Sequence, residues 1–492
     1  MTKVHLDGKL CLLAAMGFYM DFDQRLPIKI DSTSNGEFVP RELPTINTHA
    51  NRIAREAIDL NRRKQRTNRR KFLLTACAAA SSFVAFNQVN AAAGRRGGAF
   101  KVSPQSVSDH EHAANELAGN EFIFDVQGHY VVPPSLRRTL KPVCAEQSAV
   151  LSRDYMRCIG ADDFIKDIFF DSDTDMMVLS FVPSRRDDEP LTAAEAAATR
   201  NIVEKLDGTQ RLLIHGRCNP NQEGDLEGMD ELAEKHRVSA WKCYTQWGPD
   251  GTGFFLTDET AGIPFIEKAR TLGIKNICIH KGIPFSQQSY EHSTCRDIGI
   301  AAKQFPDVNF LIYHSGYVPG ETEGPYNPYR GRGIDELIAS VERAGLGLNS
   351  NVYAELGTTW RFLMRNPDEA AHVLGKLIKH LGPDNVLYGS DCVWYGSPQD
   401  QIQALRLFQI STEFQERFGY APLTDKIKAK IFGLNAARVY NVNVPQVQSP
   451  QDHIADAIEN YRNDPRPHYE TWGPKTRREF LRLQTLRGHG AP

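Results

Sequence analysis

Eight short apolar runs separated by helix-forming segments constrain the fold of this chain more than any other feature. The runs lie at residues 122–130, 176–183, 211–217, 239–246, 276–280, 309–314, 351–355 and 385–393. The segments between them, such as LTAAEAAATRNIVEKL and DELAEKHR, are rich in residues that favour helices. Strands that alternate with helices form parallel crossover units, so we predict a (β/α)8 TIM barrel. An open, doubly wound sheet is the alternative, but no GxGxxG fingerprint follows any of these runs.

The predicted barrel occupies only part of the 492 residues. We assign the remaining regions as an N-terminal extension of unknown role (1–66), a signal-like segment (67–93), a linker (94–120), the barrel (121–441) and a C-terminal helical tail (442–492). The formal net charge of −2, with both signs plentiful, gives no reason to expect nucleic acid as a partner. The arginines of the tail fit either a solvated face or an arm that packs on a second copy in a homo-dimer.

The nine cysteines have no paired CxxC spacing, so the sequence predicts neither a zinc finger nor a disulfide framework.

Residues 67–93 are similar to a twin-arginine export signal. Arg69 and Arg70 precede Phe72 and a weakly apolar run, and an A-x-A-like pattern ends at Ala91. This predicts recognition by the twin-arginine export machinery and a periplasmic or exported location. A signal normally lies at the N-terminus, whereas this one follows roughly 65 residues. There are therefore three alternatives: an uncleaved signal that anchors the protein in the membrane, an amphipathic or buried alanine-rich helix, and an upstream segment that belongs to a different start. A cytoplasmic location is the alternative to export.

Polar side chains follow the ends of several predicted strands. Because side chains alternate along a strand, Gln127 and His129 point to the same side. The ends of the later runs carry His280, His314, Glu355 and Asp391. Taken singly, such residues are more often core, turn or capping residues. The C-terminal ends of barrel strands meet at one rim, however, and imidazoles and carboxylates gathered there suit a mononuclear divalent metal with an open position.

The motifs QGH, IHKG, IYHSG and YGSDCVW at these strand ends resemble those of the amidohydrolase superfamily. The closer likeness is to the branch of metal-dependent decarboxylases of aromatic and muconic-semialdehyde acids. The segment IFGLNAARVYN resembles the helix that closes the barrel in that branch. The resemblance covers about residues 121–441 and implies that His129, His280 and Asp391 bind one divalent metal. It also implies that His314 is a catalytic acid/base beside the metal.

The family usually has histidine or glutamate where this chain has Gln127, whose amide oxygen would be an uncharged fourth ligand. Zinc suits the imidazoles, and manganese would tolerate the oxygen ligands. Metal-activated water could hydrolyse a C–N, C–O or C–C bond of a small carbonyl or carboxylated substrate, with Asp391 or His314 taking the proton. Non-oxidative decarboxylation of an aromatic or unsaturated acid would use the same side chains. A non-catalytic barrel degenerate at Gln127 is a further alternative.

Lys242 lies in the sequence SAWKCYTQWG at the end of the fourth predicted strand. Binuclear members of the superfamily carboxylate a lysine on this strand to bridge two metals, but such sites also use an imidazole that Gln127 lacks. We therefore expect the ammonium to pair with a substrate carboxylate or to orient a ligand. A lysine that only caps the strand end is equally compatible. Trp247, Trp394 and Tyr395 would either line an aromatic pocket or pack at the rim.

Overall fold

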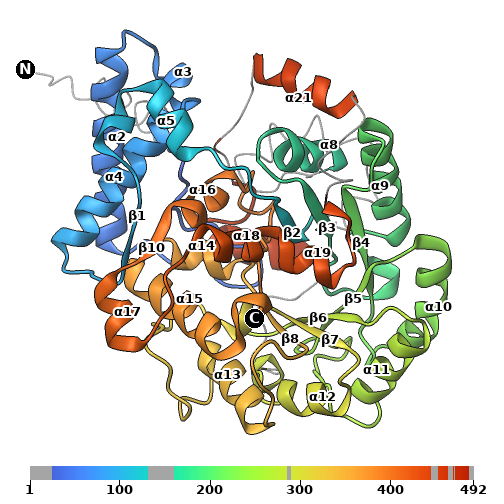
Figure 1. Cartoon of the computed structure of the whole chain (residues 1–492). Coiled ribbons are helices and arrows are strands. Elements are labelled where there is room, and N and C mark those ends of the chain that lie inside the picture. Colours follow the sequence, from blue (N-terminus) through green and yellow to red (C-terminus); the bar gives the residue numbers. More distant parts are fainter. Residues whose placement is uncertain are drawn as a thin grey trace, which may run out of the picture.

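The computed structural model describes residues 25–130, 160–284, 290–444, 453–463, 469 and 471–486. Its centre is a parallel sheet of eight strands in sequence order (Figure 1). The strands are β2 (Phe124–Gly128), β3 (Met176–Leu179), β4 (Leu212–Arg217), β5 (Ala240–Tyr244), β6 (Asn276–His280), β7 (Asn309–Tyr313), β8 (Val352–Glu355) and β9 (Val386–Leu387). The chain after β9 pairs with β2, since Val126 N donates to Tyr388 O at 3.1 Å and Asp391 N donates to Gln127 O at 3.0 Å. The sheet therefore closes, and the predicted TIM barrel is confirmed.

Helices surround the strands, as Figure 1 shows. They are α8 (Ala161–Ile165), α9 (Ala193–Asp207), α10 (Asp225–His236), α11 (Gly262–Thr271), α12 (Ile298–Gln304), α13 (Gly333–Arg343), α14 (Thr359–Leu363), α15 (Pro367–Leu381), α16 (Gln399–Leu407), α17 (Thr412–Phe418) and α18 (Asp425–Ala429). Local sequence sets their ends. A capping box between Thr192 and Glu195 starts α9, and Gly208 ends it with φ 71°.

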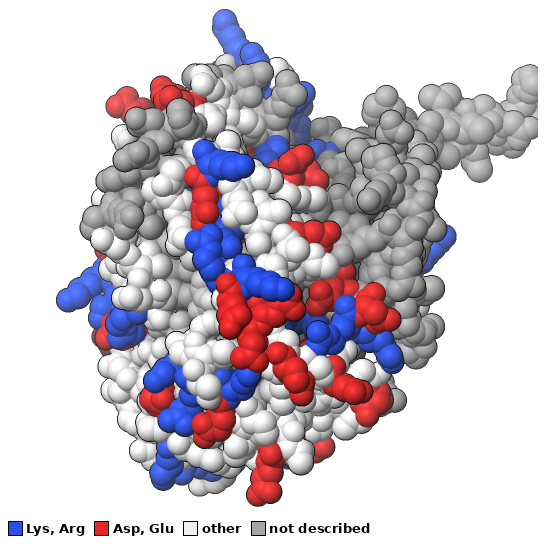
Figure 2. Space-filling model, turned by 90° about the vertical axis from the view of Figure 1, so that its right-hand side faces the viewer, with Lys and Arg blue, Asp and Glu red and all other residues white. Residues whose placement is uncertain are grey.

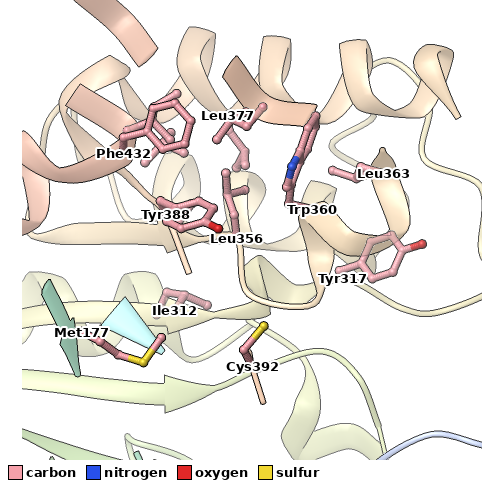
Figure 3. Packing of buried hydrophobic residues seen from close by; sticks show 14 of the residues in the cluster. Met177, Ile312, Tyr317, Leu356, Trp360, Leu363, Leu377, Tyr388, Cys392 and Phe432 are labelled. Atoms are coloured by element: carbon pink, nitrogen blue, oxygen red, sulfur yellow. The ribbon is translucent and has the colours of Figure 1, made fainter. Parts of the chain in front are cut away.

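Two apolar layers hold the barrel together. The larger one lies between the outer faces of the strands and the helices, and Figure 3 shows Leu356, Trp360 and Leu377 in it. The smaller one fills the barrel interior with Phe124, Val126 and other strand residues. It is continued by the C-terminal helix α19 (Asn435–Val439), which follows a π-helical turn at Lys430–Leu434. The segment that resembled a barrel-closing helix is therefore helical and packs against the strand interior.

The six cysteines in the described part of the chain are all buried and free, namely Cys77, Cys218, Cys243, Cys278, Cys295 and Cys392. They pack as small apolar side chains, as expected for cysteines without a pairing pattern.

The N-terminal region folds as a helical layer beside the barrel, drawn in blue in Figure 1. Its helices are α2 (Thr45–Lys64), α3 (Arg69–Leu73), α4 (Ala76–Ala92) and α5 (His110–Leu117). The signal-like segment is buried here: Phe83 and Phe86 have no exposed surface and belong to the same apolar cluster as the barrel helices. Arg69 pairs with Asp59 at 3.2 Å. This arrangement matches the alternative of a buried alanine-rich helix, and export stays a prediction.

The segment 94–120 is folded rather than an extended linker. Its strand β1 (Gly98–Phe100) pairs antiparallel with β10 (Phe408–Ile410), and α5 follows. Phe100 and Leu117 are buried in the main apolar cluster, which explains why the segment is ordered. The prediction of a linker at 94–120 did not include this strand.

The described part of the C-terminal tail contains α21 (His453–Asn463) and α22 (Arg477–Leu486). Between them Trp472 is buried, and its indole donates to Asp167 Oδ2 at 3.0 Å. Among all described helices, none combines the length and the apolar character that a membrane crossing requires. On the face that Figure 2 presents, basic and acidic side chains lie side by side, so neither sign dominates it.

Candidate metal centre and active site

His280 and His314 face each other at the C-terminal ends of neighbouring strands. His280 ends β6, His314 follows β7, and Nε2 of His314 lies 3.1 Å from Nδ1 of His280. Backbone carbonyls fix both tautomers, because Ile283 O lies 3.4 Å from His280 Nε2 and Gly357 O lies 2.7 Å from His314 Nδ1. A carbonyl can only accept, so these two ring nitrogens carry the protons. The facing nitrogens therefore both present lone pairs, an arrangement that a cation would stabilise.

Burial keeps these imidazoles neutral. Loss of solvent lowers the pKa of His314 to about 4. Burial, with the nearby charges of His314 and Lys242, lowers the pKa of His280 well below its ordinary value. Neutral imidazoles are the form that binds metals, so both rings are ready to act as ligands near pH 7.

A second group of predicted ligands gathers around Asp391. His129 Nε2 lies 3.2 Å from Asp391 Oδ1, and the amide of Gln127 donates to the same oxygen at 3.0 Å. Ser180 O lies 3.1 Å from His129 Nδ1 and can accept a hydrogen bond from that ring nitrogen. Burial opposes ionisation of Asp391, but the hydrogen bond and charge of His129 hold its pKa below the ordinary value.

The convergence of Gln127 and His129 depends on an irregularity in β2. The β2–β3 register shifts between Asp125 and Gly128. A bulge of this kind redirects side chains at a strand end. The two residues contact each other as predicted, with Gln127 Nε2 3.4 Å from His129 Nε2. Gln127 Oε1 is buried without a hydrogen-bond partner among the described residues, and such an orphaned oxygen fits a cation ligand.

Two glycines make room for the site. A Cβ at Gly357 would overlap Gln127 Oε1, and one at Gly389 would overlap Glu355 Oε1. Glu355 accepts hydrogen bonds from the backbone of His314 at 3.0 Å and of Gly357 at 2.6 Å. Burial raises the pKa of Glu355 to about 8 in spite of these bonds. Glu355 thus holds the loop that carries His314. Gly357 and Gly389, the glycines of the ELG and YGSD motifs, are needed because any larger side chain would overlap the side chains of the site.

Backbone strain also concentrates here. His314, Ser315, Thr358 and Asp391 have positive φ angles of 66°, 52°, 55° and 56°. Residues with a Cβ rarely adopt this conformation, and in folded proteins such outliers cluster at functional sites.

Lys242 lies inside the barrel with no exposed surface. Its Nζ is 3.9 Å from the centre of the Tyr313 ring and 4.7 Å from that of Tyr244, and it has no hydrogen-bond partner among the described residues. Burial lowers the pKa of this ammonium. Acidic groups nearby, Glu37 and Asp391 among them, offset only part of this effect of burial, so the position favours a bound anion.

Of the aromatic residues expected at the rim, Tyr395 reaches the site through Thr358. The Tyr395 hydroxyl lies 2.8 Å from Thr358 Oγ1, which donates to Asp391 Oδ2 at 2.5 Å. Trp247 and Trp394 are buried, and the carbonyl of Trp394 accepts from the backbone of Trp472 at 2.8 Å. Thr358 was not anticipated from the sequence.

The N-terminal segment 25–38, which had no predicted role, enters the site. Asn35 donates from its amide to Asp391 Oδ2 at 2.8 Å, and Glu37 Oε1 lies 3.6 Å from His280 Nδ1. Ligand atoms of Glu37, His280 and His314 all lie within 4.8 Å of one another. Asn35 and Glu37 are also bonded to each other at 2.6 Å, so they link the Asp391 group to the histidine pair. No periodic pattern in the sequence marks either residue.

The donor set consists of three buried imidazoles, two carboxylates and an amide oxygen, and these donor types fit a divalent cation. The amidohydrolase family model matches residues 169–442 of this chain. No curated protein matches it.

Several solved structures are similar in fold. The 5-carboxyvanillate decarboxylase LigW from Sphingomonas paucimobilis is 14% identical, with 66% of this chain and 100% of that chain covered and a TM-score of 0.39. The 4-oxalomesaconate hydratase LigJ from Rhodopseudomonas palustris is 18% identical, with 70% and 99% covered and a TM-score of 0.40. A manganese-bound 5-carboxyvanillate decarboxylase mutant from Novosphingobium aromaticivorans is 13% identical, with 66% and 98% covered and a TM-score of 0.44.

Proposed function

Because this chain belongs to the amidohydrolase family, whose enzymes use a divalent metal, we propose that it is a metal-dependent hydrolase of a small carboxylated substrate. The observation that carries the proposal is the pair of neutral imidazole lone pairs, on His280 and His314, that face each other 3.1 Å apart in a fully buried site. A cation bound at Nδ1 of His280 would relieve the contact between the two lone pairs and leave Nε2 of His314 beside the ion.

The proposed metal ligands are His129, His280 and Asp391, with the Gln127 amide oxygen beside them. The imidazoles favour zinc, and manganese is the second choice because oxygen donors complete the set. When bound, such an ion polarises a substrate carbonyl and lowers the pKa of water.

The protein side chains supply proton transfer and binding. Asp391 is anionic and can accept a proton from the attacking water, while Thr358 and Asn35 hold its second oxygen in place. His314 presents an unprotonated Nε2, because Gly357 O holds the proton on Nδ1. Its Nε2 can therefore take up a proton and return it to the leaving group. The Lys242 ammonium binds a carboxylate of the substrate, which would supply the hydrogen-bond partner that its Nζ lacks among the described residues.

One observation favours a second candidate, the decarboxylation of an aromatic or unsaturated acid. The rings beside Lys242 Nζ belong to Tyr313 and Tyr244, and Tyr244 stacks on His280 with centroids 4.7 Å apart. A conjugated acid would find an aromatic wall next to the cation that binds its carboxylate.

The test begins with metal content. Elemental analysis of purified wild type, after incubation with zinc or manganese, should give about one ion per chain, as expected for a mononuclear site. The double variant His280→Ala with Asp391→Ala should lose the ion, whereas the control His49→Ala with Asp187→Ala, both exposed residues, should keep it. A wild type that binds neither metal would refute the proposal.

The reaction is then assigned with metal-loaded protein and a panel of carboxylated amides, lactones and aromatic acids. Mass spectrometry of the products separates addition of water from loss of carbon dioxide. Turnover that survives Lys242→Met unchanged would contradict the assigned role of Lys242 but leave the metal site standing.

A further inference from the structure

We infer that Glu37, carried by the N-terminal segment 25–38, is itself a metal ligand and supplies the negative charge that Gln127 lacks. This inference rests on the proposed metal site. It assigns part of the catalytic centre to a region outside the barrel.

Geometry is the first support. The carboxylate of Glu37 approaches the side of His280 that bears the lone pair, with Oε1 3.6 Å from Nδ1. The lone pair of His314 Nε2 faces the same point, and the three ligand atoms all lie within 4.8 Å of one another. A carboxylate oxygen and two imidazole nitrogens thus converge on one point, and these are donor types that bind divalent zinc or manganese.

The Glu37 carboxylate is also oriented toward this point. Asn35 Nδ2 donates to Glu37 Oε2 at 2.6 Å, and Glu37 N donates back to Asn35 Oδ1 at 3.0 Å. These bonds hold one carboxylate oxygen away from the histidines and leave the other directed at His280. The same Nδ2 bonds Asp391 Oδ2, so one amide sets the positions of both carboxylates.

The segment that carries Glu37 is fixed to the barrel loops and the tail. Lys29 pairs with Asp400 at 3.2 Å, and Asp31 pairs with the buried Arg361 at 3.0 Å. Ser34 N donates to Pro474 O at 2.9 Å, and the rings of Phe38 and Phe362 lie 5.1 Å apart. These contacts therefore hold Glu37 in a defined position at the end of the barrel.

Charge gives the second support. With Gln127 neutral, Asp391 is the one anionic residue among the ligands predicted from the sequence, so a divalent ion there would keep an uncompensated positive charge. The buried Lys242 ammonium would add to it. Uncompensated charge in a buried site is strongly unfavourable. A second carboxylate, from Glu37, balances the ion.

The experiment compares the zinc dissociation constants of four proteins by competition with a chelator, with elemental analysis for stoichiometry. Glu37→Gln should weaken zinc binding about 100-fold or more, the upper range for loss of groups that support a metal. The matched control Glu42→Gln, on an exposed residue five positions after Glu37, should bind like wild type. The double variant Glu37→Gln with Gln127→Glu should recover most of the affinity, because the charge returns at a different position.

Cobalt-substituted protein gives an independent readout. The visible absorption of cobalt should change in Glu37→Gln and not in Glu42→Gln, because the ligand field reports direct coordination. Equal zinc affinity and equal cobalt spectra for wild type and Glu37→Gln would overturn the inference while leaving the proposed function intact. A wild type without any metal would refute both.

Discussion

The side-chain amide of Asn35 donates a hydrogen bond to Oδ2 of Asp391 at 2.8 Å, across 356 positions of the chain. The same amide group bonds Glu37 at 2.6 Å. A residue outside the barrel thus helps to orient the carboxylate that we propose as a metal ligand.

Asn35→Ala should raise the zinc dissociation constant about tenfold, the lower range for loss of a group that orients a ligand. The effect should be smaller than that of Glu37→Gln, because Thr358 still donates to Asp391. Chelator competition measures it, with the exposed Asn120→Ala as control. Unchanged affinity in Asn35→Ala would show that the hydrogen bond does not position Asp391.

Arg361 is the buried cation that holds the N-terminal segment in place. It pairs with Asp31 at 3.0 Å and with Asp400 at 3.3 Å, and it has no exposed surface. Arg361→Leu leaves these carboxylates without their shared partner, which should cost about 3–5 kcal/mol of stability. Urea unfolding measures the loss, and limited proteolysis should release the N-terminal segment faster than in wild type. A variant with the wild-type midpoint and cleavage rate would contradict this role.

Sequence patterns predicted those parts of the fold and site that depend on local order. The strand ends at His280, His314 and Asp391 follow from apolar runs and from the geometry of parallel strands, which gathers such ends at one rim. Asn35 and Glu37 were not predicted, because a segment without helix or strand shows no periodic pattern of apolar residues. Their partners Asp391 and His280 also lie hundreds of residues away in the sequence. Thr358 was not predicted either, because it lies in a loop and its own backbone has a positive φ that no sequence pattern indicates.

The role of residues 76–92 was ambiguous for a physical reason. An alanine-rich helix that is apolar on all sides has the same composition whether it is buried in a protein or recognised by an export system. The structure buries α4, with Phe83 and Phe86 inside the main cluster.

This burial leads to a prediction about processing. Cleavage after Ala91 would remove Phe83 and Phe86 from the core and would also remove Glu37 from the site. We therefore expect the active protein in its native cell to retain the residues before Ala91, whether or not it is exported. N-terminal sequencing of that protein is the measurement. A mature, active chain that begins near residue 92 would contradict both the prediction and the assignment of Glu37.

Phe86→Ala tests the packing separately. Loss of a fully buried phenylalanine should lower the free energy of unfolding by about 3–5 kcal/mol. Leu60→Ala, at an exposed position of α2, serves as the control and should change stability little. Equal midpoints for Phe86→Ala and wild type in urea would show that α4 does not contribute to the folded core.

The buried ammonium of Lys242 should lower the stability of the metal-free protein while it strengthens the binding of a carboxylate. Its Nζ is buried against aromatic rings without a hydrogen-bond partner in the described chain. Lys242→Met keeps the side-chain volume and removes the buried charge, so the metal-free protein should become more stable by about 1–3 kcal/mol. Binding of benzoate to the metal-loaded protein should weaken at the same time. Calorimetry and thermal melting measure the two effects, and a less stable Lys242→Met would mean that the charge is compensated within the protein.

His372, whose ring packs against Phe414, Phe418 and Tyr420, should make the stability depend on pH. Burial, with the charge of Lys376, lowers the pKa of His372 to about 4, whereas an unfolded chain titrates near pH 6.5. Between these values the unfolded state binds more protons, so stability is complete above about pH 6.5 and falls as the pH drops toward 4. His372→Gln keeps an acceptor for the Tyr420 hydroxyl, which lies 3.0 Å from the ring, and removes the titration.

Urea unfolding at about pH 7.5 and about pH 5 measures this effect of His372. Wild type should lose about 2 kcal/mol more than His372→Gln over this interval, as the two pKa values require. His49→Gln, at an exposed histidine, should lose as much as wild type. If His372→Gln and wild type lose equal stability, then His372 is protonated in the folded protein as readily as in the unfolded chain. The aromatic pocket formed by Phe414, Phe418 and Tyr420 around the ring would then admit water.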